Sequence, residues 1–143
     1  MTHDEHSIPP GADEATVDAV GKLSEALETT ERARGHLYSF HQLTGQADLQ
    51  LGEAARMLRE AGHEEEAAGL ETEIVGRNVI PGHWTFQIVE AYDDTYHRPF
   101  SEAEKQVRER LLGGRRHLHE AEMKRRRRTP GHPDHTMGPG AQD

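Results

Sequence analysis

The chain of 143 residues contains no cysteine, which excludes disulfides, thiolate metal ligands and a cysteine nucleophile. Lysine occurs only three times and asparagine once. No uncharged stretch approaches the ~20 apolar residues that a membrane-spanning helix needs. The first residues have neither the basic region nor the apolar segment of a secretory signal, so we expect a cytoplasmic protein without a membrane partner.

Signatures of nucleophilic catalysis are also missing. The chain has no Gly-x-Ser-x-Gly sequence and no phosphate-binding loop. It has four serines, and Ser39 lies three residues after His36, but that proximity alone does not indicate catalysis. We assign no catalytic residue and favour a protein that is not an enzyme.

The charge of the chain is strongly acidic but unevenly distributed. There are 26 acidic and 17 basic residues, for a net charge of −9. Residues 114–143 carry a net charge of +3, which leaves −12 on residues 1–113. An acidic body argues against a nucleic-acid partner, because nucleic-acid binding needs a net basic surface.

Hydrophobic residues make up only 33% of the chain, which is low for a globular domain. A fold built from so few apolar residues needs them well aligned, or it needs burial against another subunit. We therefore expect a homo-oligomer, with a dimer favoured.

Apolar residues recur at spacings of three and four along most of the chain, and no stretch alternates apolar and polar residues as a strand does. The pattern predicts an all-α fold, an antiparallel bundle of four to five helices. We expect this bundle to span residues 13–128, between disordered tails at 1–12 and 129–143, which are rich in proline, glycine and histidine.

Capping and breaking residues predict where the helices begin and end. Asp13 is expected to cap a first helix that stops near Thr44 and Gly45, and Gly62 to end a second. The later boundaries are expected at the acidic start 64–66, the loop 76–82, Pro99, a capping box opened by Ser101, and the pair Gly113 and Gly114.

Aromatic residues concentrate between Ile74 and Phe100, which holds the only Trp, two of three Tyr and two of three Phe. This segment is interpreted either as the central helix of the core or as a binding face. In the second interpretation, ligand or partner binding involves Arg77, Asn78, His83, Trp84, Tyr92, Tyr96 and Arg98. Arg77 and Arg98 would then contact a small anionic ligand.

Polar residues within the same segment are spaced 4, 3, 4 and 3, at His83, Gln87, Glu90, Asp94 and His97. On one continuous helix they fall within an arc of about 80°. The stripe is either a solvated face or a metal site, in which Glu90, Asp94 and His97 would bind a divalent ion such as iron, manganese or zinc. Asp94-x-x-His97 imitates the Glu-x-x-His motif of di-iron bundles, but no second copy of the motif occurs.

The remaining histidines are expected to form local pairs. His41 is interpreted as a satisfied histidine at the edge of the core. Three-residue spacing favours pairs of His117 with Glu120 and of His119 with Glu122.

The run from Arg125 to Arg128 is the densest charge cluster of the chain. It is interpreted as a solvated helix end, as a contact with the acidic body or a second subunit, or as a nucleic-acid contact. No aromatic residue interleaves with it, which weakens the nucleic-acid interpretation.

The sequence GRNVIPGHWTF at residues 76–86, followed by YDD at 92–94, resembles a small family of helical proteins from high-GC actinobacteria. The resemblance covers roughly residues 15–125. It implies an all-α fold, and it brings no known activity and no catalytic residue.

Three functions follow as hypotheses. The first is self-association or protein binding through the 76–84 loop and the helix that carries Tyr92 and Tyr96. The second is metal binding in a ferritin-like or oxidoreductase-like bundle, and the third is binding of a small anionic ligand.

Overall fold

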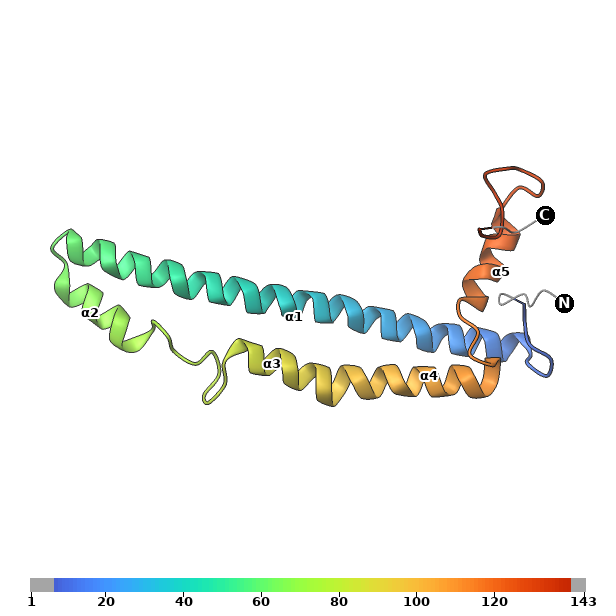
Figure 1. Cartoon of the computed structure of the whole chain (residues 1–143), viewed down its shortest axis with the longest axis horizontal. Coiled ribbons are helices and arrows are strands. Elements are labelled where there is room, and N and C mark those ends of the chain that lie inside the picture. Colours follow the sequence, from blue (N-terminus) through green and yellow to red (C-terminus); the bar gives the residue numbers. More distant parts are fainter. Residues whose placement is uncertain (1–6, 140–143) are drawn as a thin grey trace. The chain divides into compact units, whose positions relative to one another are not determined.

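A computed structural model of the chain describes residues 7–139. Its elements are all helical apart from one isolated bridge between Ile80 and His83, so the predicted all-α class is confirmed (Figure 1). In chain order they are α1 (Glu14–Glu60), α2 (Glu64–Glu73), α3 (Thr85–Tyr92), a π-helical turn η1 (Asp93–His97), α4 (Arg98–Leu112) and α5 (Leu118–Arg127). Within the described residues, no helix is both long and apolar enough to cross a membrane.

The first helix is longer than the sequence predicts. Asp13 caps it as expected, because its Oδ1 accepts a hydrogen bond of 2.8 Å from the Thr16 amide. The predicted stop at Thr44 and Gly45 is wrong, since α1 continues through both residues for 47 residues in all. One glycine in a helix interior costs only about 1 kcal/mol, and no proline interrupts the segment, so the helix propagates across it.

The end of α1 and the start of α2 follow the sequence. Gly62 adopts a φ of +92°, a left-handed conformation that glycine accepts readily, and the chain turns there. Three glutamates at 64–66 then open α2, where negative charge is favoured by the helix dipole. Gly76 and Gly82 have positive φ values and frame the predicted loop.

The region around Pro99 departs from the prediction of an end followed by a fresh capping box. Pro99 is the second residue of α4, and Ser101 lies inside that helix rather than capping it. The turn just before Pro99 is π-helical, and the Arg98 amide donates to the Asp93 carbonyl five residues earlier. The chain therefore stays helical from Thr85 to Leu112 and accommodates the proline by widening one turn.

The chain divides into two compact units. The terminal unit comprises residues 1–29 and 99–143, and the middle unit comprises residues 30–98. Residues 14–29 of helix α1 belong to the terminal unit, and its residues 30–60 belong to the middle unit. Packing of all helices as one bundle, with a domain bounded at 13 and 128, stays a prediction.

The predicted disordered tails are only partly described. Residues 1–6 and 140–143 lie outside the described residues. Residues 7–13 and 128–139 are described, and they form turns and irregular segments rather than helices. Arg115 holds one of these segments, because its guanidinium donates 3.0 Å to the Ser7 hydroxyl and also to the Ser7 carbonyl.

Candidate interaction surface

The terminal unit has an apolar core. Val17 and Val20 of α1 pack with Leu112 of α4 and Leu118 of α5, and all four are at most 4% exposed. Helix α5 approaches α1 so closely that a Cβ added to Gly21 would lie 2.9 Å from the His119 Cβ. The close packing of α5 against α1 therefore explains why position 21 is a glycine.

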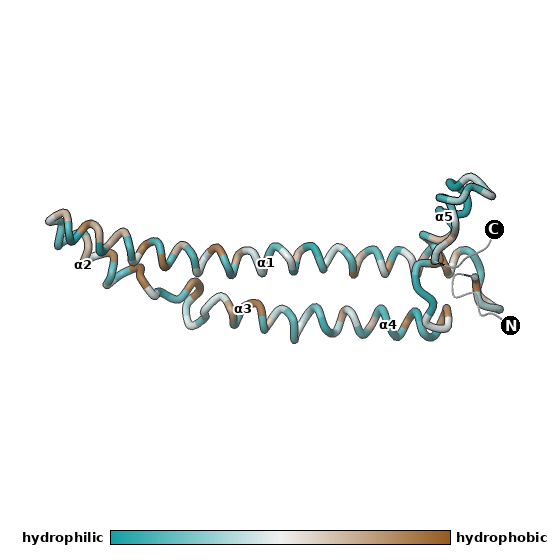
Figure 2. Tube along the Cα trace, turned by 45° about the horizontal axis from the view of Figure 1, so that its top comes forward, coloured by the Kyte–Doolittle hydropathy of each residue, from teal (hydrophilic) through white to brown (hydrophobic). Residues whose placement is uncertain are grey.

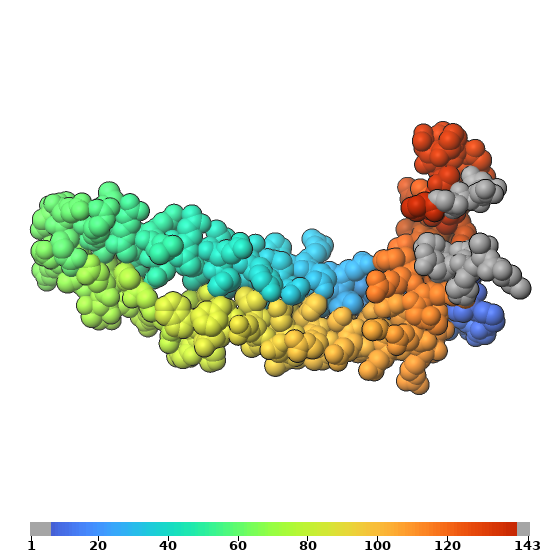
Figure 3. Space-filling model, in the orientation of Figure 1, coloured from blue at the N-terminus to red at the C-terminus, as the bar shows by residue number. Residues whose placement is uncertain are grey.

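The middle unit has no comparable core. Its buried residues are small or short: Thr30, Ala55, Ala67, Thr85 and Val89. In the space-filling view, α3 lies directly against α1 (Figure 3). What joins these segments is a series of polar side-chain contacts.

The first of these contacts is an ion pair of Arg34 with Asp93. Nε of Arg34 donates to the Asp93 carboxylate at 2.7 Å, and the Tyr38 hydroxyl donates to the same carboxylate at 3.0 Å. The hydrogen bond from Arg34 is the main reason that the pKa of Asp93 is lowered from its usual value of 3.8. Asp93 is therefore ionised in the folded protein at neutral pH and anchors η1 to α1.

Further polar contacts continue along the unit. His41 Nδ1 lies 2.7 Å from the Thr85 hydroxyl, which confirms the interpretation of His41 as a satisfied histidine. The Gly76 amide donates to the Asp48 carboxylate at 2.8 Å. The partners of successive α1 residues are found at decreasing residue numbers, so within this unit the returning segment runs opposite to α1.

The last of these polar contacts joins α1 to α2, where Arg59 forms ion pairs with Glu64 and Glu71. The hydrogen bond from Arg59 lowers the pKa of Glu71. Solvent screens exposed ion pairs of this kind, so the unit gains little stability from its polar contacts.

Apolar side chains of the middle unit lie on its surface instead. Eleven large ones are at least 38% exposed: Tyr38, Phe40, Leu43, Leu49, Met57, Ile74, Val79, Ile80, Trp84, Phe86 and Tyr96. Figure 2 shows the corresponding brown stretches where the chain leaves α2 and enters α3. The middle unit therefore leaves many of its large apolar side chains in contact with solvent.

One stretch of helix α1 in this unit is nearly free of charged residues. From Gly35 to Gly52, five turns of helix, Asp48 is the sole Asp, Glu, Lys or Arg, and its carboxylate is bound to the Gly76 amide. Leu49 in this stretch is 77% exposed. A solvated helix face is normally charged, so the neutral stretch is typical of a surface that meets another protein.

One face of this stretch, which we name the glycine face, combines small and large neutral residues. It comprises Tyr38, Gln42, Gly45, Leu49 and Gly52, which fall within an arc of about 80° at 100° per residue. A Cβ added to Gly45 or Gly52 would meet nothing within 4 Å. Within residues 7–139, nothing therefore requires glycine at these two positions.

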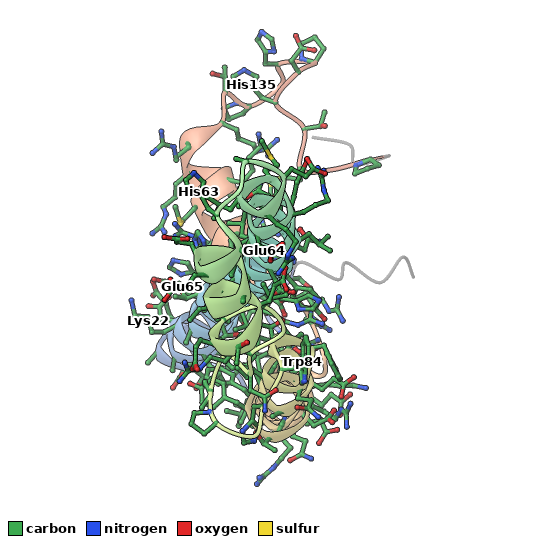
Figure 4. All side chains as sticks on the ribbon, turned by 90° about the vertical axis from the view of Figure 1, so that its left-hand side faces the viewer. Lys22, His63, Glu64, Glu65, Trp84 and His135 are labelled. Carbon is green, nitrogen blue, oxygen red and sulfur yellow. The ribbon has the colours of Figure 1, made fainter. Side chains whose placement is uncertain are left out.

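A groove of about 350 Å³ lies beside the 76–82 loop. Trp84, Arg77 and Asn78 line it together with Ile74, Val79 and a segment of α1 around Asp48. Trp84, labelled in Figure 4, precedes the first residue of α3 and is 46% exposed. The structure thus brings together three of the seven residues that the sequence proposed for ligand or partner binding.

The other four residues of that set do not line the groove. Tyr92 and Tyr96 contact each other with ring centroids 5.4 Å apart. Arg98 pairs with Asp94 at 2.8 Å, and His83 Nδ1 lies 3.1 Å from the Pro81 carbonyl oxygen. The groove therefore contains Arg77 but not Arg98, so the two arginines do not share an anion site there.

The predicted polar stripe from residue 83 to residue 97 is wrong as one helical face. His83 precedes α3, and the π-helical turn at Asp93–His97 changes the angular spacing of the residues that follow. Gln87 caps the helix start, since its side-chain oxygen accepts a 2.9 Å hydrogen bond from the Trp84 amide.

The predicted metal ligands Glu90, Asp94 and His97 do not converge. Asp94 pairs with Arg98, and the His97 Nε2 contacts the Glu31 carboxylate of α1. Among residues 7–139, the group of three metal-capable side chains whose ligand atoms lie within 4.8 Å of one another is Glu28, His117 and Glu120.

The two histidines at the start of α5 give one confirmed and one wrong pairing. His117 lies 3.9 Å from Glu120, as its spacing predicts. His119 instead pairs with Asp18 of α1, and Glu122 pairs with Arg125. Arg125 to Arg127 occupy the last turn of α5, where cations favour the helix C-terminus.

Comparison with known proteins adds no relative. No protein-family model, no curated protein and no solved structure matches this chain. The resemblance of residues 76–94 to an actinobacterial family therefore has no support from these comparisons. Sequence reasoning also missed the glycine face, although the run without charge from residue 35 to 47 was a visible signal for it.

Proposed function

We propose that the protein acts by self-association, as a cytoplasmic homodimer in which the glycine faces of two α1 helices pack against each other. The observation that carries this proposal is the neutral, exposed stretch of α1 from Gly35 to Gly52. A second copy would cover apolar side chains that the middle unit leaves exposed. No catalytic group is needed for this role.

A second copy fits the glycine face because the face is self-complementary. In an antiparallel pair with its two-fold axis near residues 48 and 49, Gly45 of one copy lies opposite Gly52 of the partner subunit. The two glycines let the backbones approach, and Leu49 of each copy lies close to the axis, where it is buried. Such an isologous contact uses one surface twice, as most dimers do.

The absence of cysteine allows a direct test. A Leu49→Cys substitution introduces the only thiol, which near a two-fold axis falls within the Cα separation of 4.4–6.8 Å or so that disulfides require. Mild oxidation should yield a covalent dimer on a non-reducing gel. Leu43→Cys is the matched control, because Leu43 is also exposed but lies on the other side of the helix.

Light scattering of the unmodified chain provides the second readout. We expect a dimer that Leu49→Glu converts to monomer, with the dissociation constant raised about tenfold or more, while Leu43→Glu leaves the dimer intact. A strict monomer at high concentration, or equal effects at both leucines, would contradict the proposal.

The groove beside Trp84 favours a second candidate function, binding of a small ligand with an apolar body. Arg77 and Asn78 supply polar contacts at the edge, and Trp84 is the only tryptophan of the chain. Ligand entry should therefore change tryptophan fluorescence. An unchanged spectrum across a panel of metabolites, including carboxylates and phosphates, would remove this candidate.

A further inference from the structure

The terminal unit contains a group of side chains that the proposed self-association does not use. Glu28 of α1, and His117 and Glu120 at the start of α5, each present a ligand atom within 4.8 Å of the other two. The Nδ1 of His117 lies 3.9 Å from Oε2 of Glu120. In the described part of the chain, the Glu28 carboxylate has no hydrogen-bond or ion-pair partner.

Two carboxylates and one imidazole form a ligand set that suits a divalent transition-metal ion. Zinc binds such atoms at about 2.0–2.2 Å, which places the ligand atoms roughly 3–3.5 Å apart around the ion. All three side chains are exposed and can close the remaining distance of about 1 Å by rotating. Without a cation, two negative carboxylates stand close together around a single imidazole.

The backbone holds His117 in place at this site. His117 has a left-handed conformation with φ +59° and ψ +32°, the single non-glycine residue with positive φ among residues 7–139. It follows the left-handed pair Gly113 and Gly114, and it directly precedes α5. Such a conformation is energetically unfavourable for a residue that carries a side chain.

A polar cavity of about 260 Å³ opens beside the group, and Glu28 and His117 both line it. Its wall contains a buried ion pair, in which Arg108 Nε donates to Glu104 at 2.9 Å and both residues are at most 7% exposed. The Ser24 hydroxyl donates to the same Glu104 carboxylate at 3.0 Å. Because Glu104 and Arg108 already bind each other, they do not need a ligand in the cavity. The cavity itself is large enough for water molecules or a small ligand.

We propose that Glu28, His117 and Glu120 form a binding site for one divalent transition-metal ion. The ion is bound by three protein ligands from two helix segments, and its remaining positions face the cavity. Arg116 also lines the cavity, and its positive charge opposes the ion. An Arg116→Ala substitution should therefore tighten binding.

The test uses the full chain without an affinity tag. Because the tails contain further histidines at 3, 6, 132 and 135, these four are replaced by glutamine in every sample. Calorimetric titration with Zn²⁺ measures stoichiometry and affinity, and Co²⁺ absorption reports the ligand set. We expect one equivalent bound by this background protein.

Two variants and one control decide the result. Glu28→Gln removes a ligand at an exposed position without affecting folding, and His117→Gly removes a ligand while relieving the left-handed strain. Each should weaken Zn²⁺ binding about tenfold or more, whereas Glu122→Gln on the same helix should leave it unchanged. Absence of binding, or binding that survives both Glu28→Gln and His117→Gly, overturns the proposal.

Discussion

The two units of this chain use α1 in different ways. In the terminal unit, α1 contributes Val17 and Val20 to an apolar core, and its Gly21 is explained by the close approach of α5. In the middle unit, the same helix is joined to its neighbours by polar contacts, and Gly45 and Gly52 face open space. The first arrangement buries its apolar residues within one chain, whereas the second leaves exposed the surface that the proposed dimer would bury.

The largest effect should come from the core of the terminal unit. Leu112 is 2% exposed, and Leu112→Ala should lower the free energy of unfolding by about 2–5 kcal/mol through lost burial and a cavity. Leu43→Ala, at a residue 63% exposed, is the matched control and should cost little. Chemical denaturation measures both, and equal losses would show that the core is not where we place it.

A smaller effect should follow from filling Gly21. In Gly21→Ala the new Cβ would lie 2.9 Å from the His119 Cβ, so α5 must shift, at a cost of about 1–3 kcal/mol. Gly35→Ala, where a Cβ meets nothing within 4 Å, should instead stabilise α1 by up to about 1 kcal/mol. Thermal melting would contradict this contrast if both substitutions changed stability in the same direction.

The glycine face predicts opposite signs for folding and for association. Gly45→Ala and Gly52→Ala should each stabilise the helix of the monomer by about 1 kcal/mol, because nothing in the chain opposes the added methyl group. In a close helix pair the same methyl groups should raise the dimer dissociation constant. Thermal melting of dilute samples measures the stability of the monomer, and light scattering measures its association. Tighter association in these variants would contradict a closely packed dimer.

The smallest effect concerns acid. Because the folded-state pKa of Asp93 is lowered, its ion pair contributes stability that is present above the unfolded pKa of about 3.9 and is lost as pH falls through the folded value. The wild-type chain should therefore lose melting temperature in this range more steeply than Asp93→Asn. If the melting temperatures of the two proteins fell equally with pH, the ion pair of Asp93 would not contribute to acid-sensitive stability.

Local signals in the sequence predicted much of the fold. Asp13, Gly62, the glutamates at 64–66 and the glycine pair at 113 and 114 lie at helix boundaries, because capping and left-handed turns depend on residues close in sequence. The stop at Gly45 was wrong because helix propagation tolerates one unfavourable residue.

The site was less predictable for a physical reason. Trp84, Arg77 and Asn78 could be grouped from the sequence because one loop carries them. Glu28 and His117 lie 89 positions apart, and only the return of the chain brings them together. The ligand set from 90 to 97 assumed an unbroken α-helical period, which the turn at Asp93–His97 does not keep.

That turn has a further consequence for how the sequence tolerates change. A π-helical turn is equivalent to an α-helical turn that has gained one residue, so η1 contains one residue more than an unbroken α-helix would have there. Removing a single residue between 93 and 97 should therefore convert this turn to an α-helical turn and leave the rotational phase of the residues before and after it nearly unchanged. Homologous chains should therefore differ in length by one residue more readily at this turn than within α3 or α4.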